Sequence, residues 1–340
     1  MSAPEPRANP LLLGHHSAET TILDALRAGR MHHAWLITGP DGVGKATLGF
    51  RFARRVLAAL PADLAAVTDL ALAPTNPIFR RVAAGSHADL LTIELGVNEK
   101  TGRQRTQIAV EDVRRIGGFM SLTPAEGGWR VVVVDGAEDL NLASENALLK
   151  VLEEPPARAL LILCCTAPGR LLPTIRSRCR RLRLDPLDDA AMAELLAAYL
   201  PDLADDERLR LVGLAEGSPG RALKLAEAEG LKIAALVDEV LAALPNLPAT
   251  RAYALADTLL RGEGGFSTFM DMLRTGLAAA VRDAVRGRAD PEQARIAALR
   301  SPDAWVEVWQ ALSRLQDETE WFNLDKRQAL VAGLGMLSGG

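Results

Sequence analysis

The chain is poor in cysteine and aromatic residues, and neither sign of charge dominates it. Its 340 residues include three cysteines, Cys164, Cys165 and Cys179, whose spacing supports neither a disulfide framework nor a thiolate zinc site. The net charge of -4 excludes a strongly basic nucleic-acid-binding chain, so any contact with DNA has to come from a local patch or from a complex. What remains is an ordinary soluble composition, 49% hydrophobic and 24% charged.

Long apolar runs are also missing. No stretch of about 18 apolar residues occurs, so we expect no membrane span. The first residues, MSAPEPRANP, are polar and proline-rich, unlike a signal peptide, and the expected location is the cytoplasm. The histidine doublets at 15–16 and 32–33 lack cysteine or carboxylate partners at ligand spacing, so we expect surface or helix-end histidines and no bound metal.

A glycine-rich loop, GPDGVGKAT at residues 39–47, is the first motif with chemical content. The apolar run before it predicts a strand, and the apolar spacing after it predicts a helix that stops at Pro61. This is the context of a phosphate-binding loop, in which backbone N–H groups and a helix N-terminus hold phosphates. A glycine-rich turn with an incidental lysine is the alternative. The predicted nucleotide-binding residues are Gly39, Gly42 and Gly44 through their N–H groups, Lys45 at the β- and γ-phosphates, and Thr47 at an α-phosphate.

Two positions of this motif depart from a hydrolysing enzyme. The hydroxyl residue that ligates Mg²⁺ after the lysine is replaced by Ala46. Downstream, an apolar strand ends in Asp135, the expected partner of Mg²⁺ through water, but the carboxylate that should follow is Gly136. Glu138 and Asp139 are predicted to face solvent. The sequence therefore predicts a module that binds ATP or ADP with Mg²⁺ weak or absent, and does not turn it over.

Strands alternate with helices in the first half of the chain, which predicts an α/β fold with a parallel sheet covered on both faces. The apolar runs that predict its five strands are 34–38, 89–95, 130–135, 159–166 and 181–184. From Asp185 onward the pattern is helical only. We expect an α/β P-loop domain over 1–184, a small helical domain over 185–232 and a second helical domain over 233–340.

Three further motifs, taken together, resemble the clamp-loader branch of the AAA+ superfamily. They are ENALLKVLEEPP (145–156), TAPGRLLPTIRSRCR (166–180) and GSPGRAL (217–223), and the resemblance covers roughly residues 10–230. LLKVLEEPP alone would predict no more than an amphipathic surface helix. The resemblance implies an AAA+ P-loop module with a five-stranded parallel sheet, a helical lid, and an all-α C-terminal collar that assembles five subunits into a ring.

The resemblance also implies roles for individual residues. Thr166 matches the polar sensor that faces the γ-phosphate, and Arg221 matches the lid arginine that touches nucleotide in cis. Arg178 matches the arginine finger, a catalytic residue supplied in trans to the neighbouring subunit's ATP; a surface arginine in a basic cluster is the alternative. Many relatives carry a four-cysteine zinc module after the P-loop helix, but residues 61–88 hold no cysteine here, so no zinc is expected.

The function implied by the resemblance is that of a non-hydrolysing subunit in the clamp loader of bacterial DNA polymerase III. Its partners would be the other loader subunits of a hetero-pentameric ring, with the sliding clamp and primed DNA reached through the complex. The C-terminal helices, which carry Trp305, Trp309 and Trp321, are expected to drive assembly, or else to form an ordinary core. A self-sufficient AAA+ ATPase and a scaffold with no nucleotide role stay open as alternatives.

Overall fold

The computed structural model describes residues 4–96, 105–227, 230–261 and 264–338, in two compact units, 1–223 and 224–340. The first unit holds a five-stranded sheet in the order β2-β3-β4-β1-β5, in which every neighbouring pair is parallel. The strands are β1 (Ala34–Thr38), β2 (Leu90–Ile93), β3 (Arg130–Asp135), β4 (Ala159–Cys165) and β5 (Arg180–Arg183). This confirms the predicted α/β fold. Because β1 lies between β4 and β5, the P-loop leaves the sheet from an inner strand.

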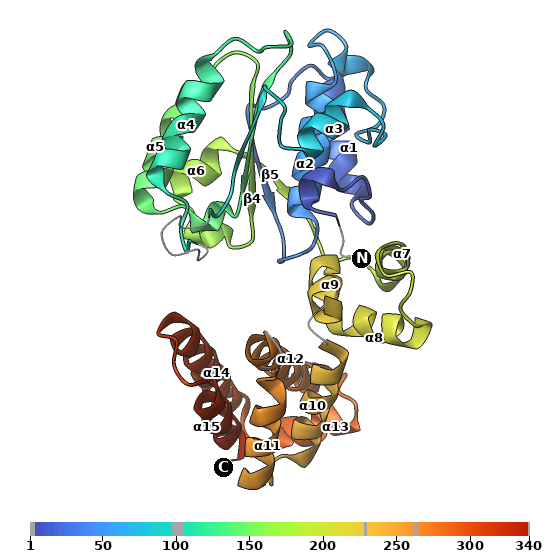
Figure 1. Ribbon diagram of the computed structural model, residues 1–340, viewed down its shortest axis with the longest axis vertical. Coiled ribbons are helices and arrows are strands. Elements are labelled where there is room, and N and C mark those ends of the chain that lie inside the picture. The colour runs from blue at the N-terminus through green and yellow to red at the C-terminus, as the bar shows by residue number, and fades with distance from the viewer. Residues whose placement is uncertain (1–3, 97–104, 228–229, 262–263, 339–340) are drawn as a thin grey trace. The chain divides into compact units, whose positions relative to one another are not determined.

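Helices cover both faces of this sheet, with α1, α2 and α3 on one face and α4, α5 and α6 on the other (Figure 1). Their bounds are α1 His16–Arg27, α2 Lys45–Leu57, α3 Pro77–Ala83, α4 Val110–Ser121, α5 Leu142–Glu153 and α6 Pro173–Arg178. Successive side chains of β1 point to opposite faces of the sheet. Trp35 packs edge-on against Phe52 of α2, with ring centroids 5.5 Å apart, whereas Leu36 belongs to the core with Ile116 and Leu148 of α4 and α5. Burial on both faces explains the nearly continuous apolar strands.

Residues 61–88, which lack cysteine, fold around an apolar core and a buried arginine. The 3-10 helix η2 (Leu64–Ala66), the segment after it and α3 contribute buried side chains, namely Leu64, Val67, Leu70, Phe79 and Val82. Arg54 of α2 is 2% exposed, stacks 4.4 Å over the centre of the Phe79 ring, and donates to the carbonyls of Arg7 and Asn9. Burial lowers the pKa of Arg54 to about 10. Within the described ranges, no group of three or more His, Cys, Asp or Glu side chains could hold a metal ion.

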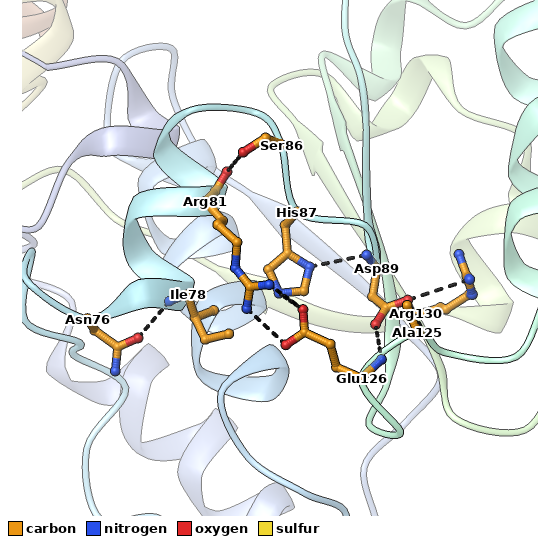
Figure 2. Close-up of polar contacts among 9 residues, drawn as sticks. All are labelled: Asn76, Ile78, Arg81, Ser86, His87, Asp89, Ala125, Glu126 and Arg130. Atoms are coloured by element: carbon orange, nitrogen blue, oxygen red, sulfur yellow. Dashed lines mark hydrogen bonds and ion pairs between the residues drawn. The ribbon is translucent and has the colours of Figure 1, made fainter.

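A buried polar cluster lies at the amino ends of β2 and β3, whereas the P-loop follows the carboxyl end of β1. Figure 2 shows the side chains of this cluster. Asp89, just before β2, is 1% exposed and accepts the N–H groups of Ala125 at 2.8 Å and Glu126 at 3.1 Å. Its Oδ1 also lies 3.5 Å from the guanidinium Nη2 of Arg130, the first residue of β3. One carboxylate therefore fixes the turn that leads into β3.

His87, in the same cluster, is 4% exposed and accepts the N–H of Asp89 through Nδ1 at 3.1 Å (Figure 2). Its Nε2 lies 3.9 Å from Glu126, which is ion-paired with Arg81. Burial lowers the pKa of His87, and the positive charge of Arg81 acts in the same direction, while Glu126 and Asp89 oppose them. Because the pKa of His87 is lower in the folded protein, its imidazole becomes protonated in the unfolded chain first, as the pH falls below about 6.5. The free energy of unfolding decreases through that window, down to the folded-state pKa.

We expect His87→Gln to remove this contribution to the pH dependence, which amounts to at most about 1.4 kcal/mol per pH unit. Urea unfolding at about pH 7.5 and about pH 5.5 measures it. His16→Gln is the matched control, because His16 is exposed at the start of α1, and it should keep the wild-type dependence. Equal pH dependence in wild type and His87→Gln would contradict the assignment.

The rest of the chain is helical. The first unit continues with α7 (Asp189–Tyr199), α8 (Asp205–Ala215) and the start of α9 (Pro219–Glu227). The second unit contains α10 Gly230–Ala243, α11 Ala249–Leu259, α12 Gly265–Val285, α13 Pro291–Ala298, α14 Pro302–Trp321 and α15 Lys326–Ser338. Trp305 is 3% exposed and belongs to the core of this unit, whereas Trp309 and Trp321 are 40% and 73% exposed. No helix in the described ranges has the length and apolar character needed to span a membrane.

Candidate functional site

The P-loop is held in shape by the chain's own donors. It connects β1 to α2, which begins at Lys45 with Gly44 in a left-handed conformation as its N-cap. Lys45 is 8% exposed, and its Nζ donates to the carbonyl of Pro40 at 2.7 Å. The carbonyl of Val43 accepts a bond of 2.8 Å from Nε2 of His15, a buried residue at the N-cap of α1. His15 is thus a helix-end histidine, and its ring supports the loop.

Backbone and side-chain contacts also join the P-loop to the start of α9. The N–H of Gly220 donates to the carbonyl of Gly42 at 2.9 Å, and the hydroxyl of Ser218 donates to the carbonyl of Asp41 at 2.7 Å. Gly42 has a φ of +70°, and a Cβ on it would lie 2.6 Å from the Ser218 hydroxyl oxygen. We call these four residues the P-loop clasp. The clasp joins the start of α9 to the loop through the chain's own groups.

Gly220 is required in the clasp because a Cβ there would lie 2.7 Å from the Cα of Gly42. We expect Gly220→Ala to lower the free energy of unfolding by about 1–3 kcal/mol, since the two backbones have to separate. Urea unfolding measures the change, and hydrogen exchange of the P-loop amides locates it. Gly213→Ala is the matched control. Gly213 is exposed in α8 with no atom within 4 Å of a built Cβ, so alanine should add about 0.5–1 kcal/mol there. Equal effects of the two substitutions would contradict the clasp.

A pocket of about 320 Å³ lies at the carboxyl ends of the strands, beside the P-loop. Lys45, Asp135 and Thr166, predicted from three separate motifs, all line it. The other lining residues are Asp41, Glu94, Leu95, Gly136, Glu138, Asp139 and Cys164. Thr47 is buried in the first turn of α2, and the side chain of Arg221 is ion-paired with Glu216 at 3.0 Å. Three of the predicted nucleotide-binding residues, Lys45, Asp135 and Thr166, thus lie around one pocket.

The pocket is acidic. Its lining in the described part of the chain includes five carboxylates, those of Asp41, Glu94, Asp135, Glu138 and Asp139, against the one lysine. Burial raises the pKa of Asp135, partly opposed by the charge of Lys45, and burial together with Glu138 raises the pKa of Asp139. The charged side chains that line this pocket in the described part of the chain are therefore mainly carboxyl groups, and burial makes two of them harder to ionise.

Glu138 and Asp139 were expected to face solvent, but the structure places both in the pocket lining. The reason is the 3-10 helix η3 (Ala137–Asp139), which follows Gly136, a residue with a φ of +78°. This turn brings Glu138 back toward the sheet, where its carboxylate accepts the N–H of Thr166 at 3.1 Å. The positive φ cannot be recognised from an isolated glycine in the sequence.

The donors in the pocket do not fit Mg²⁺-assisted hydrolysis. At the position of the usual hydroxyl ligand, Ala46 presents a methyl group at the start of α2. Gly136 offers no side chain to polarise water, although the Glu138 carboxylate lies in the same pocket. The ligand set of metal-assisted phosphoryl transfer is therefore incomplete.

Arg178 lies away from this pocket, at the last residue of α6. This short helix is followed by β5, which is an edge strand of the sheet. The guanidinium of Arg178 donates to the carbonyl of Thr174 at 3.2 Å and is ion-paired with Glu153 of α5 at 2.8 Å. Sequence reasoning did not find Glu153, because helical spacing does not show which element α5 meets.

The parallel sheet, the P-loop between β1 and α2, and the helices that follow β5 define the class of this protein as an α/β P-loop module with a helical C-terminal region. A protein-family model described as DNA polymerase III, delta subunit, matches residues 14–188. The chain belongs to this family, and the predicted resemblance is confirmed.

Individual relatives agree with the family. The delta' subunit of DNA polymerase III from Pseudomonas aeruginosa is 37% identical over 193 residues, which cover 57% of this chain and 55% of that protein. The delta' subunit from Escherichia coli is 32% identical, over 60% of this chain and 57% of that protein. The chain therefore spans little more than half the length of these relatives. A solved structure of a gamma-subunit-related protein from Thermotoga maritima covers 93% of this chain and 98% of its own, with 18% identity and a TM-score of 0.43.

Proposed function

We propose that this chain is a subunit of the DNA polymerase III clamp loader that does not hydrolyse ATP itself and supplies Arg178 to the ATP site of a neighbouring subunit. The observation that carries the proposal is the composition of its own site. Lys45 is bonded to its own loop, and the hydroxyl ligand of Mg²⁺ is replaced by Ala46. Family membership and the similarity to delta' subunits support the clamp-loader assignment.

The chain's own nucleotide site is, in this proposal, weak or unused. The carboxyl groups of the described pocket lining disfavour a polyphosphate, and the clasp joins the P-loop to the start of α9 through the chain's own groups. ATP or ADP would be held by Lys45 and the loop N–H groups, with Thr166 and Arg221 at its margins. Arg221 would have to leave Glu216 to reach the nucleotide.

Residues 185–232 are proposed to act as the lid, and residues 233–340 as a collar that assembles with the other loader subunits in a ring of five. The partly exposed Trp309 and the exposed Trp321 support an interface in the second unit. The sliding clamp and primed DNA would be reached through the complex.

Co-assembly tests the clamp-loader assignment. The purified chain should elute with the remaining loader subunits of the same organism as one complex in gel filtration, in stoichiometric amount. Failure to co-elute, with each partner shown to be folded, would remove the assignment.

One observation favours a second candidate, a self-sufficient AAA+ ATPase. Glu138 places a carboxylate in the pocket with Lys45 and Asp135, where it could polarise water in place of the missing residue at position 136. Its bond to the N–H of Thr166 already occupies one carboxylate oxygen, and Ala46 still leaves the metal without its hydroxyl ligand. These two facts favour the non-hydrolysing subunit.

A further inference from the structure

The carboxyl ends of α5 and α6 meet at Glu153 and Arg178. Nη2 of Arg178 lies 2.8 Å from Oε1 of Glu153, and Nη1 donates to the carbonyl of Thr174 at 3.2 Å. Both terminal nitrogens are thus engaged within the same subunit. An arginine that binds phosphate uses two parallel N–H donors. Arg178 keeps further N–H groups, but its ion pair with Glu153 and its bond to Thr174 hold the guanidinium against its own subunit.

The contact between Glu153 and Arg178 is more exposed to solvent than the contact that α5 makes with the beginning of α6. The side chains of Arg178 and Glu153 are 37% and 50% exposed, and ion pairs this exposed contribute little. By contrast, Glu145 of α5 is 5% exposed and accepts the N–H of Leu172, at the N-cap of α6, at 2.9 Å. Helix α5 therefore contacts the start of α6 through a buried carboxylate and contacts Arg178 through a solvent-accessible one.

We propose that Glu153 is a positioning residue that latches Arg178 onto its own subunit until the triphosphate of a neighbouring subunit displaces it. This rests on the proposed function, in which Arg178 serves that neighbour. A triphosphate carries more negative charge than one carboxylate, so it can take over both terminal nitrogens once the subunits close. Before closure the latch keeps the arginine away, and hydrolysis stays low without DNA and clamp.

Loss of the contact between Glu153 and Arg178 should raise the rate of ATP hydrolysis only in the absence of clamp and DNA. In a loader reconstituted from purified subunits, we expect Glu153→Gln to raise the basal rate, without clamp and DNA, about 2- to 5-fold, which is the range that an exposed ion pair can supply. The rate stimulated by clamp and DNA should change less than about 2-fold, because phosphate has then replaced the carboxylate. The ratio of stimulated to basal hydrolysis therefore falls.

The matched control is Glu154→Gln, which removes the neighbouring exposed carboxylate at the C-cap of α5 and should leave the ratio unchanged. The double variant Glu153→Gln/Arg178→Ala should behave like Arg178→Ala alone. General damage to α5 would lower both rates, so a selective rise of the basal rate separates the latch from a structural role. The melting temperature of the isolated Glu153→Gln chain should match the wild type.

The outcomes are distinguishable. A lower ratio in Glu153→Gln that disappears in the double variant supports the latch. An unchanged ratio, or a fall of both rates, while Arg178→Ala abolishes hydrolysis at the neighbouring site, overturns the latch and leaves the proposed function standing. Hydrolysis unaffected by Arg178→Ala overturns both.

Discussion

Arg178→Ala is expected to lower hydrolysis at the neighbouring ATP site by about 10³- to 10⁵-fold, the range over which arginine fingers act in phosphoryl transfer. A guanidinium group is planar and positively charged, and its N–H groups match the geometry of phosphate oxygens. The measurement uses a reconstituted loader in which the P-loop lysines of the other sites are replaced, so that the site facing this chain is the one that can turn over.

Assembly of that loader should survive the substitution, because Arg178 is partly exposed at the end of α6 and its ion pair with Glu153 is solvent-accessible. Arg181→Ala provides the control. Arg181 lies three residues after Arg178 in the sequence and is exposed on β5. Its replacement by alanine should leave the rate of ATP hydrolysis unchanged. Equal rates for wild type and Arg178→Ala in an intact complex would reduce Arg178 to a surface charge.

Asp89→Ala is expected to lower the free energy of unfolding of the first unit by about 3–5 kcal/mol, the range seen when one partner of a buried ion pair is removed. The substitution leaves the guanidinium of Arg130, which is 7% exposed, without its carboxylate. It also leaves the N–H groups of Ala125 and Glu126 without their acceptor. Hydrogen exchange of the buried amides of β3 and β4 measures the change within this unit.

Asp63→Ala serves as the control for this prediction, because Asp63 is exposed in the same part of the chain and makes no side-chain cap bond to η2. Its effect should stay within about 0.5 kcal/mol. If the two aspartates cost the same, the cluster at the amino ends of β2 and β3 does not organise the turn before β3.

The sheet could be predicted from the sequence because strands buried on both faces leave apolar runs with sharp ends. The runs at 34–38 and 130–135 match β1 and β3 residue for residue, and the predicted fifth strand at 181–184 is displaced by one residue from β5. The short α6 could not be predicted, since six residues that begin with proline give too little periodicity to distinguish a helix from a loop.

The pocket was predictable in part for a topological reason. The carboxyl ends of parallel strands meet at one edge of a sheet, so residues that follow different strands, such as Lys45, Asp135 and Thr166, come together there. The clasp between Gly42 and Gly220 and the pair of Glu153 with Arg178 join segments that no local pattern connects. Their existence depends on how α9 and α6 pack, which the sequence pattern does not specify.

Steady-state ATP turnover by the isolated chain, beside its Lys45→Ala variant, tests most directly whether this subunit lacks hydrolysis of its own. Lys45 is the lysine that lines the pocket beside the P-loop in the described part of the chain, so the rate of the Lys45→Ala variant serves as the background rate. With Ala46 in place of the hydroxyl ligand and Gly136 in place of the carboxylate, the two rates should be indistinguishable. Turnover clearly above that of Lys45→Ala would contradict the proposal and would direct attention to Glu138 as the group that polarises water.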